Sequence, residues 1–190
     1  YIYDTLCGNK IELSPMSFYQ VNTIQAEILY AYAKECANLS GDDLLLDLYC
    51  GVGTIGLSFS DKLSKLIGGE IISEAVENAK KNALANNVTN AEFICGDAGQ
   101  IAASLAIQNL TPNVIVIDPP RKGCDTLTLD SIVKMSPAKV VMISCNPATA
   151  ARDAKYFCEN GFTVDRVRAV DLFPRTGHVE CILLMSKKKQ

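Results

Sequence analysis

The sequence lacks tryptophan and contains a single histidine, His178. A zinc site built on two or more histidines is therefore excluded. None of the eight cysteines forms a C-x-x-C pair, so the spacing typical of a zinc ribbon or an iron–sulfur cluster is also absent. We expect no metal site in this chain.

Long apolar runs and a strong excess of one charge are missing as well. No stretch approaches the roughly 20 apolar residues that span a bilayer, and no signal peptide is visible. The 18 Lys and Arg against 21 Asp and Glu give a net charge of −3. This balance argues against a nucleic-acid partner held by bulk charge, but it leaves room for a local basic patch or a further domain.

The length and the thiols indicate one reduced, globular domain. A chain of 190 residues with 48% hydrophobic residues fits a single domain with a sizeable core. Eight thiols in such a chain favour a cytoplasmic protein over a disulfide scaffold, and most of them are expected to be inert core residues. The chain begins at Tyr1 without a methionine, so we expect a fragment of a longer protein.

Apolar runs and helical periodicity alternate along the chain. Residues 1–20 are predicted to form a hairpin, with its turn at Gly8-Asn9, and a lead-in segment. Continuous apolar strands joined by helices predict an α/β fold with a mostly parallel sheet covered on both faces. Two last strands without a helix between them predict a C-terminal antiparallel hairpin. The seven expected strands of this sheet lie at 44–49, 65–71, 91–95, 113–117, 139–144, 162–170 and 178–186. Helices are expected at 21–38, around 57–59, and at 73–86 with Ser73 as N-cap, 98–107, 126–134 and 148–159.

A glycine-rich stretch lies between the first of these strands and its helix. Gly51, Gly53 and Gly56 form a G-x-G-x-x-G pattern. Glu70 ends the next strand, where an acid can take the diol of a ribose. The pattern fits a nicotinamide dinucleotide or S-adenosylmethionine, and a tight turn without a ligand is the structural alternative.

Two further acids bear on that choice. Asp47 stands four residues before the first glycine, where a carboxylate would repel a pyrophosphate and suit the ammonium and sulfonium of S-adenosylmethionine. Asp97 follows the third strand, where it either contacts an adenine or caps the next helix.

Reactive side chains follow the fourth and fifth strands. Asp118 opens the rigid turn Asp118-Pro119-Pro120-Arg121, and Cys145 stands between a strand and a helix N-terminus. That electropositive setting predicts a lowered pKa for the Cys145 thiol. Glu180, at the start of the last strand, either returns to the same sheet edge or is an exposed acid in a hairpin turn.

These motifs resemble the catalytic domain of the RNA uracil-5-methyltransferases, which make 5-methyluridine in transfer and ribosomal RNA. The resemblance rests on Phe18-Tyr19-Gln20-Val21-Asn22, the Asp47–Gly53 loop, Asp118–Gly123, Ser144–Pro147 and Thr176-Gly177-His178-Val179-Glu180, which run in the family's order. It implies a Rossmann-like class I S-adenosylmethionine-dependent methyltransferase fold, with residues 21–190 as the catalytic domain. It also implies S-adenosylmethionine as cofactor and RNA, ribosomal or transfer, as partner.

The resemblance further implies a role for each motif residue. Cys145 is the expected nucleophile and Glu180 the expected general base, while Arg121 and Asn146 are expected to contact the substrate. The expected cofactor contacts are Gln20, Asp47, Tyr49, Gly51, Gly53, Thr54, Glu70, Asp97 and Asp118. Thr54 departs from the Asn common at that position. Family members usually carry an N-terminal RNA-binding barrel and a central domain, in some cases with an iron–sulfur cluster, and neither is in this sequence.

Other functions remain open at this stage. An amino-methyltransferase acting on adenine or cytosine nitrogen uses a similar Asp-Pro-Pro turn but needs no cysteine. A nicotinamide-dependent dehydrogenase explains the glycines alone, and a non-catalytic RNA-binding module explains none of the acids. His178 competes with Glu180 as base, because residues two apart on a strand point to the same face.

Overall fold

Strands and helices alternate through residues 2–15 and 17–188, the residues that the computed structural model describes; positions 1, 16, 189 and 190 lie outside them. The strands are β1 (Ile2–Leu6), β2 (Asn9–Leu13), β3 (Leu44–Leu48), β4 (Lys65–Glu70), β5 (Ala91–Cys95), β6 (Val114–Ile117), β7 (Lys139–Ser144), β8 (Phe162–Val170) and β9 (Glu180–Lys187). The α-helices are α1 (Thr23–Ala37), α2 (Thr54–Phe59), α3 (Ser73–Ala85), α4 (Ala98–Ile107), α5 (Thr126–Met135) and α6 (Pro147–Glu159). These bounds confirm the predicted alternation.

The main sheet has seven strands in the order β5-β4-β3-β6-β7-β9-β8. The pairs from β5 to β7 are all parallel, whereas β9 runs antiparallel to both β7 and β8. The predicted parallel sheet with one antiparallel strand in a C-terminal hairpin is therefore confirmed. The strand order reverses between β3 and β6, and such a switch point is where open α/β sheets bind ligands.

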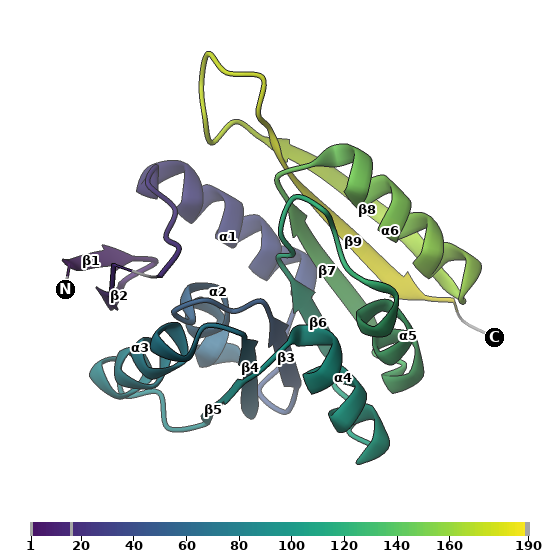
Figure 1. Ribbon diagram of the computed structural model, residues 1–190, viewed down its shortest axis with the longest axis horizontal. Coiled ribbons are helices and arrows are strands. Elements are labelled where there is room, and N and C mark those ends of the chain that lie inside the picture. Colours follow the sequence, from purple (N-terminus) through teal and green to yellow (C-terminus); the bar gives the residue numbers. More distant parts are fainter. Residues whose placement is uncertain (1, 16, 189–190) are drawn as a thin grey trace.

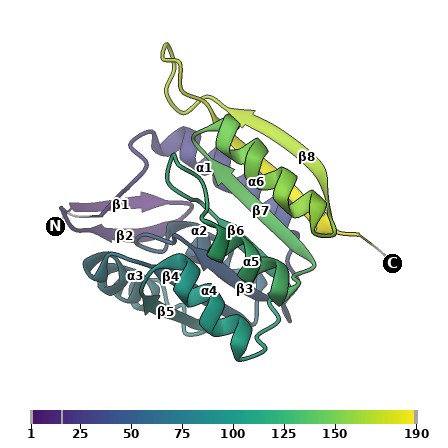
Figure 2. The ribbon, with the colours of Figure 1, turned by 45° about the vertical axis from the view of Figure 1, so that its right-hand side comes forward.

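Helices cover both faces of this sheet (Figures 1 and 2). Alternate strand residues point to opposite faces, so Leu45 packs in the core with α1, α2 and α3, whereas Leu46 and Leu48 pack in the core with α4, α5 and α6. Both faces of β3 are thus buried, which explains why its sequence is a continuous apolar run broken only by Asp47.

The N-terminal hairpin forms a separate two-stranded sheet that packs on α3. Its turn is Cys7-Gly8, both with positive φ, so the predicted turn is displaced by one residue and Asn9 opens β2. Ile11 and Leu13 are buried in the same core as α1 and α3. The hairpin is therefore packed into the body of the described chain.

The start of α3 differs from the prediction. Ile72, not Ser73, occupies the N-cap position, and no side chain makes the capping bond. The Ile72 N–H donates instead to the Glu70 carboxylate, at 2.9 Å. The expected serine cap is therefore absent, and the acid at the end of β4 instead fixes the backbone of the residue that precedes the helix.

Cysteine burial is more varied than predicted. Cys50, Cys124 and Cys181 are buried, but Cys95 is exposed and the other four are partly exposed. All eight are free thiols. None of the described helices is long and apolar enough to cross a membrane.

Asn82 on α3 links the hairpin to the glycine loop, and we expect its loss to lower stability. Its side chain accepts from Glu12 N at 2.7 Å and donates to Val52 O at 3.1 Å and to Glu12 O. Asn82→Ala leaves these buried groups without partners, so the free energy of unfolding should fall by about 1–3 kcal/mol. Urea unfolding followed by circular dichroism measures this loss.

The matched control on the same helix is Lys80→Ala, which removes only an exposed ion pair with Glu77 and should change stability little. Equal stabilities of the two variants would contradict the assigned role of Asn82.

Candidate active site

A cavity of about 550 Å³ opens at the carboxyl ends of β3, β4, β6 and β7. Of the predicted site residues, the structure brings Gln20, Tyr49, Gly51, Glu70, Asp97, Asp118, Arg121, Cys145 and Glu180 together in its lining. Asp47, Gly53, Thr54 and Asn146 do not line it. One cavity therefore joins the residues expected for the cofactor with those expected for catalysis.

Asp47 lies beneath the glycine loop and not in the cavity wall. Its side chain is completely buried, and one carboxylate oxygen accepts from Gly56 N at 2.9 Å. The other oxygen has no hydrogen-bond partner among the described residues. Burial raises the pKa of Asp47 to about 7, with the Gly56 N–H acting in the opposite direction. Asp47 thus supports the loop from below.

Two of the other residues outside the lining, Gly53 and Thr54, also belong to the glycine loop. Gly53 has φ +86, and a Cβ there would lie 3.3 Å from Ala79 and Phe93, so a larger residue would be both strained and crowded. The Thr54 hydroxyl lies 3.3 Å from the Tyr30 hydroxyl, which is buried behind α2. These contacts support a role for both residues in shaping the loop.

Glu70 faces the cavity with its carboxylate fixed by backbone. One oxygen accepts from Gly51 N at 3.0 Å and the other from Ile72 N at 2.9 Å. The two hydrogen bonds orient the carboxylate across the end of β4, beside the glycine loop. Glu70 therefore presents a preorganised acceptor to whatever occupies the cavity.

Asp97 and Tyr49 form another part of the wall. Asp97 caps α4, accepting from Gln100 N at 3.2 Å, so the expected cap is confirmed, and its side chain also lines the cavity. Tyr49 has φ +65, which turns the chain sharply after β3. Its hydroxyl lies 3.4 Å from that of Thr128 on α5.

Gln20 brings an unpaired acceptor to the cavity from the segment before α1. Only 6% of the residue is exposed, and its Oε1 has no hydrogen-bond partner among the described residues. A buried carbonyl oxygen without a partner is costly, and a ligand that donates a hydrogen bond removes that cost.

Cys145, Asp118 and Glu180 come from three neighbouring strands. Asp118 follows β6, Cys145 follows β7, and Glu180 is the first residue of β9, which pairs antiparallel with β7. Glu180 is only 4% exposed. The antiparallel direction of β9 brings its amino end to the edge where the parallel strands finish, so the expected return of Glu180 to this edge is confirmed.

All three groups hold protons more tightly than usual. Burial and the neighbouring Glu180 and Asp47 raise the pKa of Asp118 to about 8. Burial also raises the pKa of Glu180, while Arg121 lowers it. The predicted lowering of the Cys145 pKa is wrong: burial, Glu180 and Asp118 raise it, and these effects outweigh Arg121.

Arg121 and His178 meet at the rim of the cavity. Arg121 Nη2 lies 3.3 Å from His178 Nδ1, and only Arg121 lines the cavity. The prediction that His178 and Glu180 share one strand face is wrong, because β9 begins at Glu180 and His178 belongs to the preceding loop. That loop projects from the body in Figure 1. Of Glu180 and His178, therefore, only Glu180 lines the cavity.

Asn146 is occupied by contacts within the protein. Its Nδ2 donates to Arg121 O at 3.0 Å, and its Oδ1 accepts from Ala148 N at 3.1 Å at the start of α6. Phe18, Lys122 and Asp125 line the cavity although none was singled out from the sequence. The sequence offers a signal for two of them, because Phe18 lies in the same motif as Gln20 and Lys122 lies in the same motif as Arg121.

No group of three or more His, Cys, Asp or Glu side chains within residues 2–15 and 17–188 is arranged to hold a metal ion. The lining of the cavity includes five carboxylic side chains, one thiol, one guanidinium and one ammonium group.

Curated relatives cover almost the whole chain. An uncharacterized RNA methyltransferase of Bacillus cereus (strain ATCC 10987 / NRS 248) is 46% identical over 98% of this chain and 41% of its own length. An uncharacterized RNA methyltransferase of Clostridium tetani is 47% identical over 97% of this chain and 40% of its own. The chain thus spans about two-fifths of the length of these relatives.

Solved structures match in the same way. The tRNA (uracil-54, C5)-methyltransferase of Pyrococcus abyssi, in complex with S-adenosyl-L-homocysteine, superposes with a TM-score of 0.84 at 30% identity. The match covers 97% of this chain and 44% of that one. An S-adenosylmethionine-dependent methyltransferase of Agrobacterium tumefaciens, 15% identical over 98% of this chain and 70% of its own, has a TM-score of 0.76 and shows the likeness of fold alone. These neighbours confirm the predicted class I methyltransferase fold.

The family match is equally extensive. The sequence model described as tRNA (Uracil-5-)-methyltransferase matches residues 9–188, which include both strand-end motifs, the glycine loop and the start of β9. The chain belongs to the tRNA (uracil-5-)-methyltransferase family.

Proposed function

We propose that this chain is the catalytic domain of an S-adenosylmethionine-dependent enzyme that forms 5-methyluridine in ribosomal or transfer RNA. In this proposal residues 21–190 carry the reaction and residues 1–20 lead into them. The observation that carries it is that the Cys145 thiol and the Glu180 carboxyl line the same cavity as Gln20 and Glu70. Methylation at uracil C5 requires a nucleophile and a base beside one cofactor site.

The residues of the cavity fit S-adenosylmethionine. The buried Gln20 Oε1 lacks a hydrogen-bond donor, and the ammonium of the cofactor's amino-acid end would supply one. Glu70, fixed by Gly51 and Ile72, can accept from a ribose diol. Asp97, further along the wall, suits the exocyclic amine of adenine. When bound, S-adenosylmethionine supplies an electrophilic methyl group.

The same geometry disfavours a dinucleotide. Pyrophosphates bind where glycine-loop N–H groups point freely at the ligand. Here the Gly51 N–H donates to the Glu70 carboxylate, at 3.0 Å. A phosphate at that N–H would face a negative charge, so the structure favours a cationic ligand over a nicotinamide cofactor.

Cys145 makes the reaction possible at an unreactive carbon. Its thiolate adds to uracil C6, the C5–C6 double bond opens, and the electron pair delocalises onto C5 and O4. C5 then becomes nucleophilic enough to accept a methyl group. Because the pKa of Cys145 is raised, its proton must pass to a neighbouring group as the bond to C6 forms.

Glu180 completes the cycle as the base. After methylation C5 still carries its proton, and removing this proton restores the double bond and expels the thiolate. Burial raises the pKa of Glu180, which brings a carboxylate closer to the range in which a general base works near neutral pH. An amino-methyltransferase would need neither this acid nor the thiol.

Asp118 and Arg121, in the loop after β6, assist the reaction. With a pKa of about 8, Asp118 keeps its proton at neutral pH and can donate a hydrogen bond to a ring oxygen. Arg121, at the rim, can stabilise negative charge that develops on the uracil or hold a phosphate. The target base must leave its stack to reach Cys145, so a loop or an opened helix is the expected RNA site.

Loss of Glu70 should weaken cofactor binding. Glu70→Ala removes a charge-assisted hydrogen bond to the ribose, so binding of S-adenosylmethionine should weaken by about 1.5–3 kcal/mol. Titration calorimetry measures this difference. Glu77→Ala is the control, because Glu77 is an exposed acid on α3 that pairs with Lys80 outside the cavity. Unchanged affinity in a folded Glu70→Ala variant would remove Glu70 from the cofactor site.

Loss of Cys145 should abolish methyl transfer while leaving cofactor binding nearly intact. RNA with 5-fluorouridine at the target should trap the wild-type protein covalently, because fluorine cannot leave as a proton. Denaturing gels detect the complex, which should be absent with Cys145→Ala and retained with Cys158→Ala, a partly exposed cysteine on α6. A complex formed by Cys145→Ala would assign the nucleophile to another thiol, with Cys50 of the glycine loop as the next candidate.

Loss of Glu180 should stop the reaction at a later stage. With Glu180→Gln, addition and methylation still occur but the C5 proton stays in place, because an amide does not accept it at neutral pH. A gel-stable protein–RNA complex carrying labelled methyl should therefore accumulate. His178→Ala should not accumulate it, and the opposite pattern would transfer the role of base to His178.

A further inference from the structure

One wall of the cavity is a loop that leaves the sheet after β6. This wall loop, residues 118–125, carries Asp118 and Arg121 into the cavity. Pro119 and Pro120 have no N–H to donate, and the loop's own backbone contributes a single turn, from Gly123 N to Pro120 O at 2.8 Å. The wall loop needs external partners to hold one conformation.

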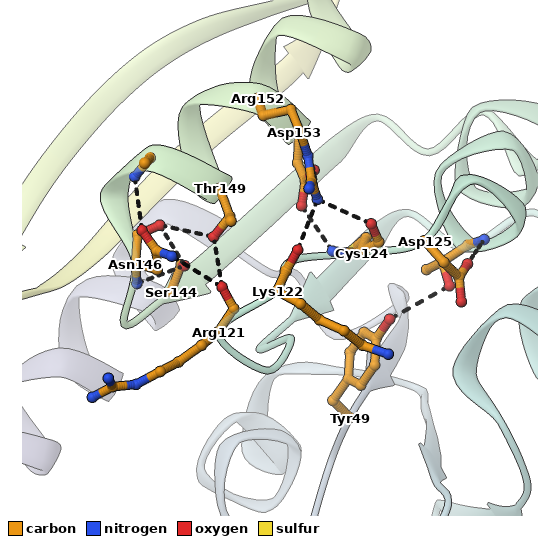
Figure 3. A network of polar contacts seen from close by, with 12 residues as sticks. Tyr49, Arg121, Lys122, Cys124, Asp125, Ser144, Asn146, Thr149, Arg152 and Asp153 are labelled. Carbon is orange, nitrogen blue, oxygen red and sulfur yellow. Dashed lines mark hydrogen bonds and ion pairs between the residues drawn. The ribbon is translucent and has the colours of Figure 1, made fainter.

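Those partners come from α6, the helix that directly follows Cys145. Figure 3 shows side chains of α6 pointing at the main chain of the wall loop. At the start of the helix, Asn146 Nδ2 donates to Arg121 O at 3.0 Å and Thr149 Oγ1 donates to the same carbonyl at 3.2 Å. The backbone of Arg121 is thereby tied to the segment that carries Cys145.

One turn later, a charged pair binds the rest of the loop. Arg152 Nη2 donates to Lys122 O at 3.0 Å and to Cys124 O at 3.1 Å. Asp153 accepts from Cys124 N at 2.8 Å, and its other oxygen lies 2.7 Å from Arg152 Nη2. Charge-assisted bonds of this kind are stronger than neutral ones. Only 1% of the Asp153 side chain is exposed, so this carboxylate is committed to Arg152 and the loop.

The loop is shaped to admit this pair. Gly123 has φ +77, a conformation that disfavours other residues. A Cβ at this position would lie 2.4 Å from Arg152 Nη2 and 2.6 Å from Asp153 Oδ2. The absence of a side chain at Gly123 is therefore what lets the guanidinium and the carboxylate reach the backbone.

We propose that Arg152 and Asp153 are positioning residues, which hold the wall loop in register with Cys145 so that Arg121 and Asp118 face the thiol. They touch the loop's backbone and do not line the cavity. The consequence for methyl transfer rests on the proposed function, whereas the register itself is a property of the chain alone. A shift of about 1 Å in a group that supports the reacting atoms can lower a rate about 100-fold.

The contacts of Arg152 and Asp153 with the backbone of the wall loop form a clamp, and the test breaks this clamp from its two sides. Arg152→Ala removes the guanidinium from α6, and Gly123→Ala pushes against it from the loop. The control is Lys155→Ala, which removes a long, exposed cation from the same helix without touching the loop. Each clamp variant should lower kcat by about 10- to 100-fold. The rise in KM should be smaller than this, both for S-adenosylmethionine and for the RNA substrates, which are unmodified transfer and ribosomal RNA transcripts.

The double variant distinguishes two cases: both substitutions disturb the same contact, or each causes a separate defect. If both substitutions act on the same contact, Arg152→Ala with Gly123→Ala should be little slower than the worse single variant, because coupled sites are not additive. Multiplying losses would overturn the proposal. So would a kcat for both single variants equal to that of Lys155→Ala. Arg152→Lys, which keeps the charge but loses the forked donors, should recover only part of the rate.

A second measurement needs neither RNA nor methylation. Two residues of the wall loop act on the pKa of Cys145 in opposite directions: Asp118 raises it and Arg121 lowers it, with Asp118 the larger effect. A wall loop out of register should therefore shift the pKa of the thiol. Site-resolved alkylation with iodoacetamide, followed by mass spectrometry, gives the pH midpoint for Cys145. We expect a shifted midpoint in Arg152→Ala and Gly123→Ala and no change in Lys155→Ala. An unchanged midpoint in both clamp variants would overturn the proposal, even if the protein methylates a different RNA or none.

Discussion

The parallel pairing of β3 with β4 and β6 is the constraint on which the rest of this structure depends. It brings the carboxyl ends of consecutive strands to one edge, where each following loop adds one part of the site. The glycine loop, Glu70, the wall loop and Cys145 all arrive in this way. Because β9 is antiparallel, its first residue reaches the same edge from the opposite direction, and Glu180 joins the others.

The convergence concentrates acids in a confined space. Asp47 and Asp118 keep pKa values of about 7 and 8, far above their usual range, mainly because they are buried. The folded chain therefore binds protons that the unfolded chain releases. This contribution to stability is fully present below the ordinary carboxyl pKa and is lost as pH rises toward 8. A cationic occupant of the cavity would oppose that loss.

Much of this arrangement could be predicted from the sequence, because strand ends and turn residues are local signals. The apolar run before Cys145 and the prolines after Asp118 place both residues at the edge of a sheet without knowledge of the fold. The acidity of Cys145 could not be predicted in this way. A helix N-terminus is visible in the sequence, but the carboxyls of Asp118 and Glu180 that oppose it come from distant segments.

The same reason explains the other departures. The resemblance implies a substrate contact for Asn146, and in the structure its side chain donates to Arg121 O and accepts from Ala148 N. The strand β9 begins at Glu180 and not at His178, so only Glu180 lines the cavity. The sequence pattern placed the start of this strand two residues too early. Arg152 and Asp153 carry no sequence signal, because their partners in the wall loop are backbone groups of a distant segment.

The position of β9 has a consequence for the synthesis of this protein. The strand lies between β7 and β8, and within the described sheet β8 pairs with β9 alone. On a ribosome, residues 162–170 thus have no strand to pair with until residues 180–187 have emerged. Glu180 begins that strand, so the proposed base joins the cavity only with the strand that completes the described sheet. Cys145 precedes both of these strands in the chain, so the proposed nucleophile is synthesised before the proposed base.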